Sequence, residues 1–198
     1  MFATPIDMER ALRDRCRDGF SARFVSSYAR PWATKGIEPP HGLPPQQKDF
    51  CETFLVNGID TVWSKVWNYV PRGTDYTAFI QAREGSAMAA DPLSEVGCPY
   101  VVRGFDFDYV GLLWFSDLVW RGDRWQVQLD HIHESGLSRH LRRARKEGDP
   151  EGPEHLALVE KVVQGYRILL TRARKGVFLW FEDEETRERV NACMAKEI

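Results

Sequence analysis

Two runs of consecutive apolar residues most constrain the fold of this 198-residue chain. One is DYVGLLWF at residues 108–115, and the other is VFLWF at residues 177–181. A strand with one face in solvent alternates apolar and polar residues, whereas a run that is apolar throughout is typical of a strand covered on both faces. These runs therefore predict buried strands of a mostly parallel sheet with helices packed against it.

Four other segments have the composition of strands. YTAFIQ at residues 76–81 and CPYVV at residues 98–102 are short apolar runs rich in aromatic or β-branched residues, and they predict two more buried strands. Residues 117–121 and 124–128 flank the turn sequence RGDR. This pair predicts a small hairpin at the periphery of the domain.

Two helices are predicted before the strands. Residues 6–30 have mixed helical periodicity that is broken at Gly19 and cannot continue past Pro31. Residues 36–45 hold four prolines and two glycines and predict an irregular connection. A helix is then expected over residues 60–69, where Asp60 or Thr61 is a suitable cap and two tryptophans fall four residues apart. Those tryptophans are Trp63 and Trp67.

A longer helix is predicted to begin at Gly152 and to end at Gly176, a good residue for a helix carboxyl terminus. Apolar residues recur in it at steps of three and four and predict one buried face. They are Leu156, Val159, Val163, Tyr166 and Leu170. DEETRERVNACM at residues 183–194 predicts a final helix with acidic residues in its first turn, as the helix dipole favours.

Strands alternating with helices predict an α/β domain. We expect a helical and irregular segment over residues 1–45 and one domain over residues 46–198. The chain has no run of 18 apolar residues and no signal-peptide pattern, and its four cysteines are widely scattered without a CxxC pair. These features predict a soluble, cytoplasmic protein with reduced thiols, and Cys98 is expected to be a small core residue.

The net charge of −2 means that any nucleic-acid or phosphate site must be a local patch. RHLRRARKE at residues 139–147 is the most basic run, and a solvated helix face explains it better than a phosphate site does. His131, His133 and Glu134 could be metal ligands. No further His or Cys lies at a convincing spacing, so we expect no metal site.

The segment VVRGFDFDYVGLLWF at residues 101–115 carries the first candidate site. Gly104 permits close backbone approach, and Asp106 and Asp108 could bind a ribose hydroxyl or a cationic partner. An alternative of equal weight is a tight turn in which the two aspartates cap nearby backbone.

YRILLTRARKG at residues 166–176 carries the second candidate. Arg172, Arg174 and Lys175 are placed by the helix prediction in a last turn, where cations favour the helix dipole by a few tenths to about 1 kcal/mol. A rigid helix end is also suited to hold an arginine against a transferring phosphate.

Together, GFDFDYVG and YRILLTRARKG resemble motifs V and VI of superfamily 1 DNA/RNA helicases. DLVWRGDRW at residues 117–125 narrows the resemblance to the Schlafen-like DNA/RNA helicase-type ATPase family. The similarity covers about residues 58–190. It implies a P-loop NTPase-type, RecA-like domain that corresponds to the second, C-terminal lobe of such an enzyme. In that family ATP lies between two lobes and the nucleic acid crosses their top.

The resemblance also implies roles for individual residues. Arg172 would reach the γ-phosphate of ATP, with Gly104 and Asp106 on the nucleotide side of motif V. Tyr166 and Arg167 would pack and orient motif VI. The remaining cations would contact nucleic acid or supply supporting charge; they are Arg103, Arg174 and Lys175.

The chain departs from the family pattern in three ways. Val101 and Arg103 stand where the family usually has Thr or Ser and then Gln, and Asp106 stands where it has Glu. None of the fifteen glycines is followed by lysine, so the phosphate-binding sequence GxxxxGK[ST] is not in these 198 residues. We therefore expect that the chain alone cannot hydrolyse ATP, and that it would use ATP and Mg²⁺ only with a partner lobe that carries a Walker A loop.

Three functions follow, in decreasing order of support. The first is the C-terminal lobe of a helicase-like ATPase, which supplies Arg172 to an ATP site and couples that site to DNA or RNA. The second is a degenerate helicase-like domain that binds nucleic acid or protein, with residues 139–147 as the contact surface. The third is an unrelated metal-dependent hydrolase that uses His131, His133 and nearby carboxylates.

Overall fold

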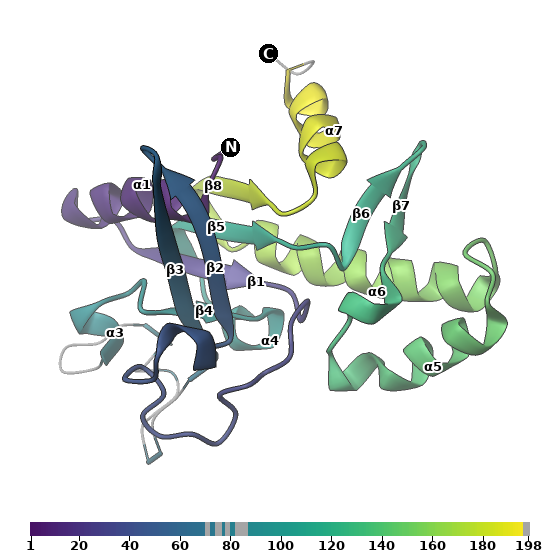
Figure 1. Ribbon diagram of the computed structural model, residues 1–198, viewed down its shortest axis with the longest axis horizontal. Helices are drawn as coiled ribbons and strands as arrows, with labels where there is room; N and C mark the ends of the chain where they lie inside the picture. The colour runs from purple at the N-terminus through teal and green to yellow at the C-terminus, as the bar shows by residue number, and fades with distance from the viewer. Residues whose placement is uncertain (70–71, 74–76, 78–79, 82–86, 196–198) are drawn as a thin grey trace.

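The computed structural model describes residues 1–69, 72–73, 77, 80–81 and 87–195. Its centre is a six-stranded sheet in the order β2-β3-β4-β1-β5-β8, in which only β2 runs antiparallel to its neighbour (Figure 1). The strands of this sheet are β1 (Ala22–Ser26), β2 (Phe50–Val56), β3 (Ile59–Trp67), β4 (Glu95–Gly97), β5 (Phe107–Trp114) and β8 (Ala173–Phe181). A separate hairpin is formed by β6 (Leu118–Arg121) and β7 (Arg124–Val127).

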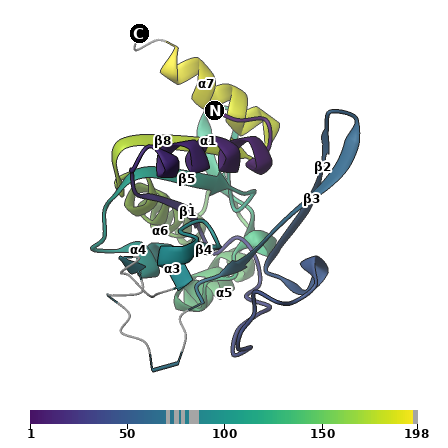
Figure 2. The same cartoon turned by 90° about the vertical axis from the view of Figure 1, so that its left-hand side faces the viewer.

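The helices cover the sheet and its ends. The α-helices are α1 (Pro5–Arg17), α3 (Ala87–Ala90), α4 (Pro99–Val102), α5 (Ser138–Glu147), α6 (Pro153–Leu170) and α7 (Glu184–Met194). The described residues also form the short 3-10 helices η1 (Pro45–Gln47), η2 (Leu129–His131) and η3 (Ser135–Leu137). Figure 2 shows the β2–β3 hairpin projecting from this body.

Two hydrophobic clusters show that the sheet is buried on both faces. Along β5, Leu112 and Trp114 pack into one cluster with Leu158 of α6, whereas Leu113 packs into the other with Leu12 of α1. Successive side chains of a strand point to opposite faces, so an apolar residue is needed at every position of such a strand. The prediction of a mostly parallel, RecA-like α/β domain is confirmed, as are the strands over residues 108–115 and 177–181.

Two further predictions of local structure are confirmed. Residues 117–121 and 124–128 form the β6–β7 hairpin, and the last helix begins after Asp183, whose carboxylate accepts a hydrogen bond from the Thr186 amide. The segment 36–45 was predicted to be an irregular connection, and it is irregular except for Pro45, which is the first residue of η1.

The helix predicted over residues 60–69 is wrong, because this segment is the strand β3. The spacing of Trp63 and Trp67 is compatible with one face of a helix and equally with one face of a strand. The decisive signal lies just upstream. Asn57 and Gly58 both have positive φ, as the two central residues of a tight hairpin turn require, and they join β2 to β3.

The segment 1–45 contributes a strand that the helical reading of residues 6–30 missed. α1 ends at Arg17, and β1 follows after Gly19, which has a φ of +87°. β1 lies in the middle of the sheet, between β4 and β5, and all five of its residues are buried. A strand this short and this buried has no alternating pattern that could distinguish it from a helix turn.

The strand predicted over residues 98–102 is also wrong. β4 ends at Gly97, and Pro99 begins the short helix α4. Proline is well suited to the first position of a helix because it lacks an amide proton that would go unpaired there. Cys98 is fully buried, in agreement with its expected place in the core. The strand predicted over residues 76–81 falls mostly outside the described residues.

The start of the long helix and most of its predicted apolar face are confirmed, but its predicted end is wrong. Tyr166 is buried, and Val159, Val163 and Leu170 pack against the same core cluster as Leu158, Val162 and Leu169. Leu156 is the exception, since it is 45% exposed. The most deeply buried stripe lies next to the predicted one on the helix, and periodicity alone could not choose between two apolar stripes. α6 ends at Leu170, six residues before Gly176, which lies inside β8.

Candidate functional site at the amino-terminal edge of the sheet

The two candidate segments meet at the end of the sheet where the strands β5 and β8 begin. The Phe107 amide donates a hydrogen bond to the Arg172 carbonyl (2.8 Å), which joins the segments directly through their backbones. Gly104 has a φ of +89°, and this left-handed conformation turns the chain from α4 into β5. The turn brings Asp106 beside Arg172, although 66 positions separate them in the sequence.

Arg172 lies in the connection between α6 and β8 and is held by three contacts. Its Nη1 lies 3.1 Å from Asp106 Oδ1, its Nε donates to the Ile168 carbonyl (3.1 Å), and its Nη2 donates to Thr171 Oγ1 (3.3 Å). A guanidinium has five N–H groups, so within the described residues two remain for an anion. The side chain is 22% exposed, which leaves it accessible from solvent.

Arg174 and Lys175 do not lie in the last turn of a helix, as the sequence predicted, but in β8. Phe107 of β5 pairs with Ala173 of β8, and Tyr109 pairs with Gly176. Two residues of β8, Arg174 and Lys175, therefore lie opposite the single residue Asp108 of β5. This is the geometry of a β-bulge, which redirects side chains at the edge of a sheet. Arg174 pairs with Asp108 (3.3 Å), and Lys175 lies over the Phe20 ring.

Asp108 connects two strands. Its Oδ2 accepts hydrogen bonds from the Ser21 amide and hydroxyl, both at 3.0 Å, and its own amide donates to Ser21 Oγ (2.9 Å). The hydrogen bond from the Ser21 amide lowers the pKa of the Asp108 carboxyl, and the positive charges of Arg174 and Lys175 lower it further. Asp108 therefore ties the start of β1 to the start of β5, which is the capping role given as its alternative.

Tyr166 anchors α6 to the centre of the domain. Its ring stacks on Trp114 with centroids 4.1 Å apart, and its hydroxyl donates to Asp117 Oδ1 (2.7 Å). Ser27 Oγ donates to the same hydroxyl (3.2 Å). These buried contacts agree with the expected packing role of Tyr166.

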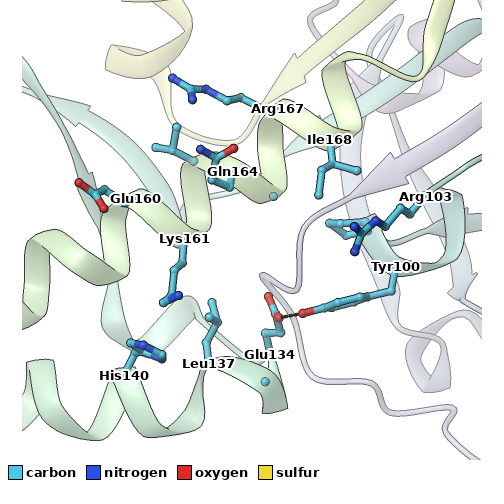
Figure 3. A pocket seen from close by; sticks show the side chains of 14 residues that line it. Tyr100, Arg103, Glu134, Leu137, His140, Glu160, Lys161, Gln164, Arg167 and Ile168 are labelled. Carbon is cyan, nitrogen blue, oxygen red and sulfur yellow. Dashed lines mark hydrogen bonds between the residues drawn. The ribbon is translucent and has the colours of Figure 1, made fainter.

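A separate cavity of about 740 Å³ lies between α4, α6 and the segment η3–α5 (Figure 3). Its polar lining residues come from all three walls, and Arg103 from the end of α4 is among them. Within the cavity Tyr100 donates a hydrogen bond to Glu134, and this bond raises the pKa of Tyr100 to about 12. The three predicted nucleic-acid contacts are thus divided: Arg103 lines this cavity, whereas Arg174 and Lys175 do not.

The remaining sequence candidates do not form a reactive cluster. His131 and His133 lie at the end of η2 and just beyond it, and in the described part of the chain no three His, Cys, Asp or Glu side chains are placed to hold a metal ion. The run 139–147 forms most of α5, where Arg145 pairs with Asp130 (2.9 Å) and Arg143 with Glu154 (3.6 Å). Across the described residues, no helix is long and apolar enough to cross a membrane.

The mostly parallel six-stranded sheet flanked by helices has the architecture of a RecA-like α/β domain. The family model for the Schlafen group 3 DNA/RNA helicase domain matches residues 1–183, and the chain belongs to this family. No curated protein and no solved structure matches the chain.

The residues that share the cavity with Arg103 are not marked as a group in the sequence. Tyr100 falls in a segment with the composition of a strand, Glu134 is a candidate only as a metal ligand, and Lys161 matches no motif. Lys161 and Arg167 are six residues apart in α6, a spacing that does not place two side chains on one helix face, so no pattern in the sequence marks them. That Lys161 and Tyr100 line one cavity depends on the fold and leaves no sign in the sequence.

Proposed function

We propose that this chain is the C-terminal lobe of a helicase-like ATPase, and that Arg172 completes an ATP site whose phosphate-binding loop lies in a second lobe. The observation that carries the proposal is the fixed position of Arg172 at the start of β8. Contacts with Asp106, Ile168 and Thr171 restrain its guanidinium while two N–H groups stay available. Restraint of this kind is what an arginine needs to stabilise charge on a transferring phosphoryl group.

Gly104 and Asp106 form the other half of this site. The turn at Gly104 leaves open space beside its Cα, so a ligand can approach the backbone closely. Asp106 is 55% exposed and keeps a second carboxylate oxygen that can accept a hydrogen bond from a ribose hydroxyl. ATP and Mg²⁺ would enter with the Walker A lobe, and DNA or RNA would be the coupled partner.

The test is the ATPase rate of the chain together with a Walker A lobe of the same family, in trans or in one polypeptide. We expect Arg172→Ala to lower kcat by about 10³-fold or more, as removal of an arginine finger does. Arg172→Lys keeps the charge but loses the planar donor fork, so it should restore only a small part of the rate.

Arg124→Ala is the matched control. Arg124 is also an arginine at the start of a strand, and its carboxylate partner is Glu151 (2.6 Å), on the β6–β7 side of the molecule. Its loss should leave kcat unchanged. An Arg172→Ala protein that hydrolyses ATP as fast as the Arg124→Ala protein would show that Arg172 is not the finger.

The second candidate function is a degenerate domain that binds nucleic acid or protein through residues 139–147. Exposed arginines of α5 favour it, but Asp130 and Glu154 neutralise two of them. If α5 is the contact surface, Arg139→Ala with Arg142→Ala should weaken binding of single-stranded DNA or RNA by the chain alone and reduce its salt dependence. Unchanged binding would exclude α5 as that surface.

A further inference from the structure

A smaller cavity of about 280 Å³ lies at the carboxyl end of β3 and shares no lining residue with the cavity around Arg103. One wall is the connection that follows β1, and the other is the end of β3, with Trp67 and the next residue, Asn68. Figure 1 shows that connection as the long loop at the bottom of the view, between β1 and β2. Ligands of open α/β sheets bind beyond the carboxyl ends of the strands, so this architecture favours a site here.

Asp49 holds the two walls of this cavity together. Its buried carboxylate accepts hydrogen bonds from the Thr34 amide (2.9 Å) and the Thr34 hydroxyl (2.5 Å), both in the connection. The same carboxylate accepts from the Trp67 amide (2.8 Å) in β3. Three hydrogen bonds to one charged group fix the connection against the strand, so the cavity is formed before any ligand enters.

Two buried N–H groups of the strand wall have no hydrogen-bond acceptor among the described residues. They are the indole Nε1 of Trp67, which is fully buried, and the amide Nδ2 of Asn68, which is 6% exposed. Asn68 Oδ1 accepts from the Cys98 amide (2.8 Å), and this bond fixes which end of the side-chain amide is the donor. Buried donors without an acceptor are rare because each has lost its hydration without replacement. A ligand that accepts from both would remove this cost.

The backbone of Asn68 is unusual in the same way. Its φ is +50°, in the left-handed region that a residue with a Cβ adopts at a cost. Asn57 also has a positive φ, but it lies in the β2–β3 turn, where the hairpin requires it. Asn68 lies in no hairpin, and hydrogen bonds to Val96 and Cys98 hold it in place. Strain maintained in this way is typical of positions that present a side chain to a ligand.

The charges around the cavity favour an anion. Lys35 lines it and pairs with no carboxylate in the part of the chain that the structure describes; its Nζ lies 5.6 Å from the centre of the Trp32 ring. Glu38 also lines the cavity, but Arg72 compensates it, with Nε 2.7 Å from the carboxylate and the backbone amide donating to it (2.9 Å). The lining therefore has a net positive charge beside two unused donors.

We propose that this cavity binds an organic carboxylate, whose two oxygens accept from Trp67 Nε1 and Asn68 Nδ2 while Lys35 balances its charge. Trp32 and Ile37, which is 41% exposed, offer apolar surface to the body of the ligand. A free carboxylic acid and the carboxyl terminus of a peptide both present this chemistry. The site goes beyond the proposed function, because it uses neither Arg172 nor a nucleotide.

The indole N–H of Trp67 reports occupancy directly. In ¹H–¹⁵N correlation spectra of the full chain, each of the seven tryptophans gives one indole signal, and sequential assignment identifies that of Trp67. Titration with sodium benzoate should shift this signal and the side-chain amide signal of Asn68, while the indole signal of Trp120 stays in place. Benzamide has nearly the same shape without the charge, so it should bind more weakly than benzoate.

Asn68→Asp tests the donor. Aspartate keeps an oxygen for the Cys98 amide and tolerates a positive φ, but a carboxylate oxygen replaces Nδ2. It should weaken benzoate binding by about 10-fold or more, because a hydrogen bond to a charged group is replaced by repulsion. Asn57→Asp makes the same change at the other asparagine of positive φ and should leave the affinity unchanged.

Lys35→Ala tests the charge without altering the core, because Lys35 is exposed. It should weaken benzoate binding by about 2- to 5-fold, the range expected for an exposed ion pair, and make the affinity less sensitive to salt. Arg172→Ala should have no effect, which separates this site from the proposed ATP site.

A pair of peptides distinguishes the two sources of the carboxylate. Tighter binding of trialanine than of benzoate, with no binding of amidated trialanine, would identify a peptide terminus; binding of benzoate alone would identify a free acid. The proposal is overturned if no carboxylate shifts the Trp67 signal, in which case bound water supplies the acceptors. It is also overturned if inorganic phosphate binds more tightly than benzoate, or if the Asn68→Asp, Lys35→Ala and Asn57→Asp proteins all bind benzoate as the wild type does.

Discussion

Asp117 is a fully buried carboxyl group at the carboxyl end of β5, where the Tyr166 hydroxyl donates to it (2.7 Å). Burial raises the pKa of Asp117 to about 7, and the hydrogen bond from Tyr166 only partly opposes this. In the unfolded chain the same group has a pKa of about 3.9. The folded protein therefore binds more protons than the unfolded chain between these two values, and stability must fall as the pH rises through this window.

We expect Asp117→Asn to remove this dependence. The amide oxygen can still accept from Tyr166, but the group no longer ionises. The wild-type free energy of unfolding should fall, relative to that of the variant, by at most about 1.4 kcal/mol for each pH unit between about pH 4 and pH 7. Urea denaturation of both proteins at several pH values measures the difference, and two parallel curves would exclude Asp117 as the titrating group.

Residues of the candidate site were predictable to different degrees. Arg172, Gly104 and Asp106 were found because the resemblance identified their short segments, and the fold brings these segments together. The contact between Asp106 and Arg172 was not predictable, because it depends on the pairing of β5 with β8. The cavity around Tyr100 was missed because its walls come from three elements and its residues match no motif.

At the scale of elements, the sequence predicted strands well where the apolar run was long and poorly where it was short. β5 and the end of β8 were identified from their apolar runs. β1 was missed, and α4 was taken for a strand, because a segment of four or five residues fits both periods. β3 could have been found from the Asn57–Gly58 turn, since both residues there need positive φ.

α6 offers a matched test of which apolar stripe faces the core. Leu158 is fully buried in the hydrophobic cluster that contains Leu112 and Trp114 of β5. Leu156, which the sequence predicted to be buried, is 45% exposed. Leu158→Ala should lower the free energy of unfolding by about 2–5 kcal/mol, because it leaves a cavity in the core. Leu156→Ala should change it by less than about 0.5 kcal/mol. Chemical denaturation measures both, and equal losses would mean that the assigned face is incorrect.

At the scale of the whole molecule, the sheet depends on β1, the strand that comes first in the sequence and lies between β4 and β5. β1 hydrogen-bonds to β4 on one side and to β5 on the other, and Phe24 and Val25 bury completely in the two opposite clusters. β4 and β5 have no other contact in the sheet order that could hold them together. The centre of the sheet is therefore assembled from an early strand that lies between two strands from the middle of the chain.

This arrangement predicts opposite outcomes for two truncations. A chain of residues 46–198 loses α1 and β1, so we expect it not to fold cooperatively, because removal of β1 leaves unpaired backbone groups on β4 and β5 and exposes both clusters. A chain of residues 1–183 keeps every strand of the sheet and loses only α7, so we expect a cooperative urea transition at lower denaturant. Circular dichroism with urea titration compares the two. A cooperative transition in the 46–198 chain would show that residues 1–45 are a separate segment, and the central position of β1 would then not be required for the fold.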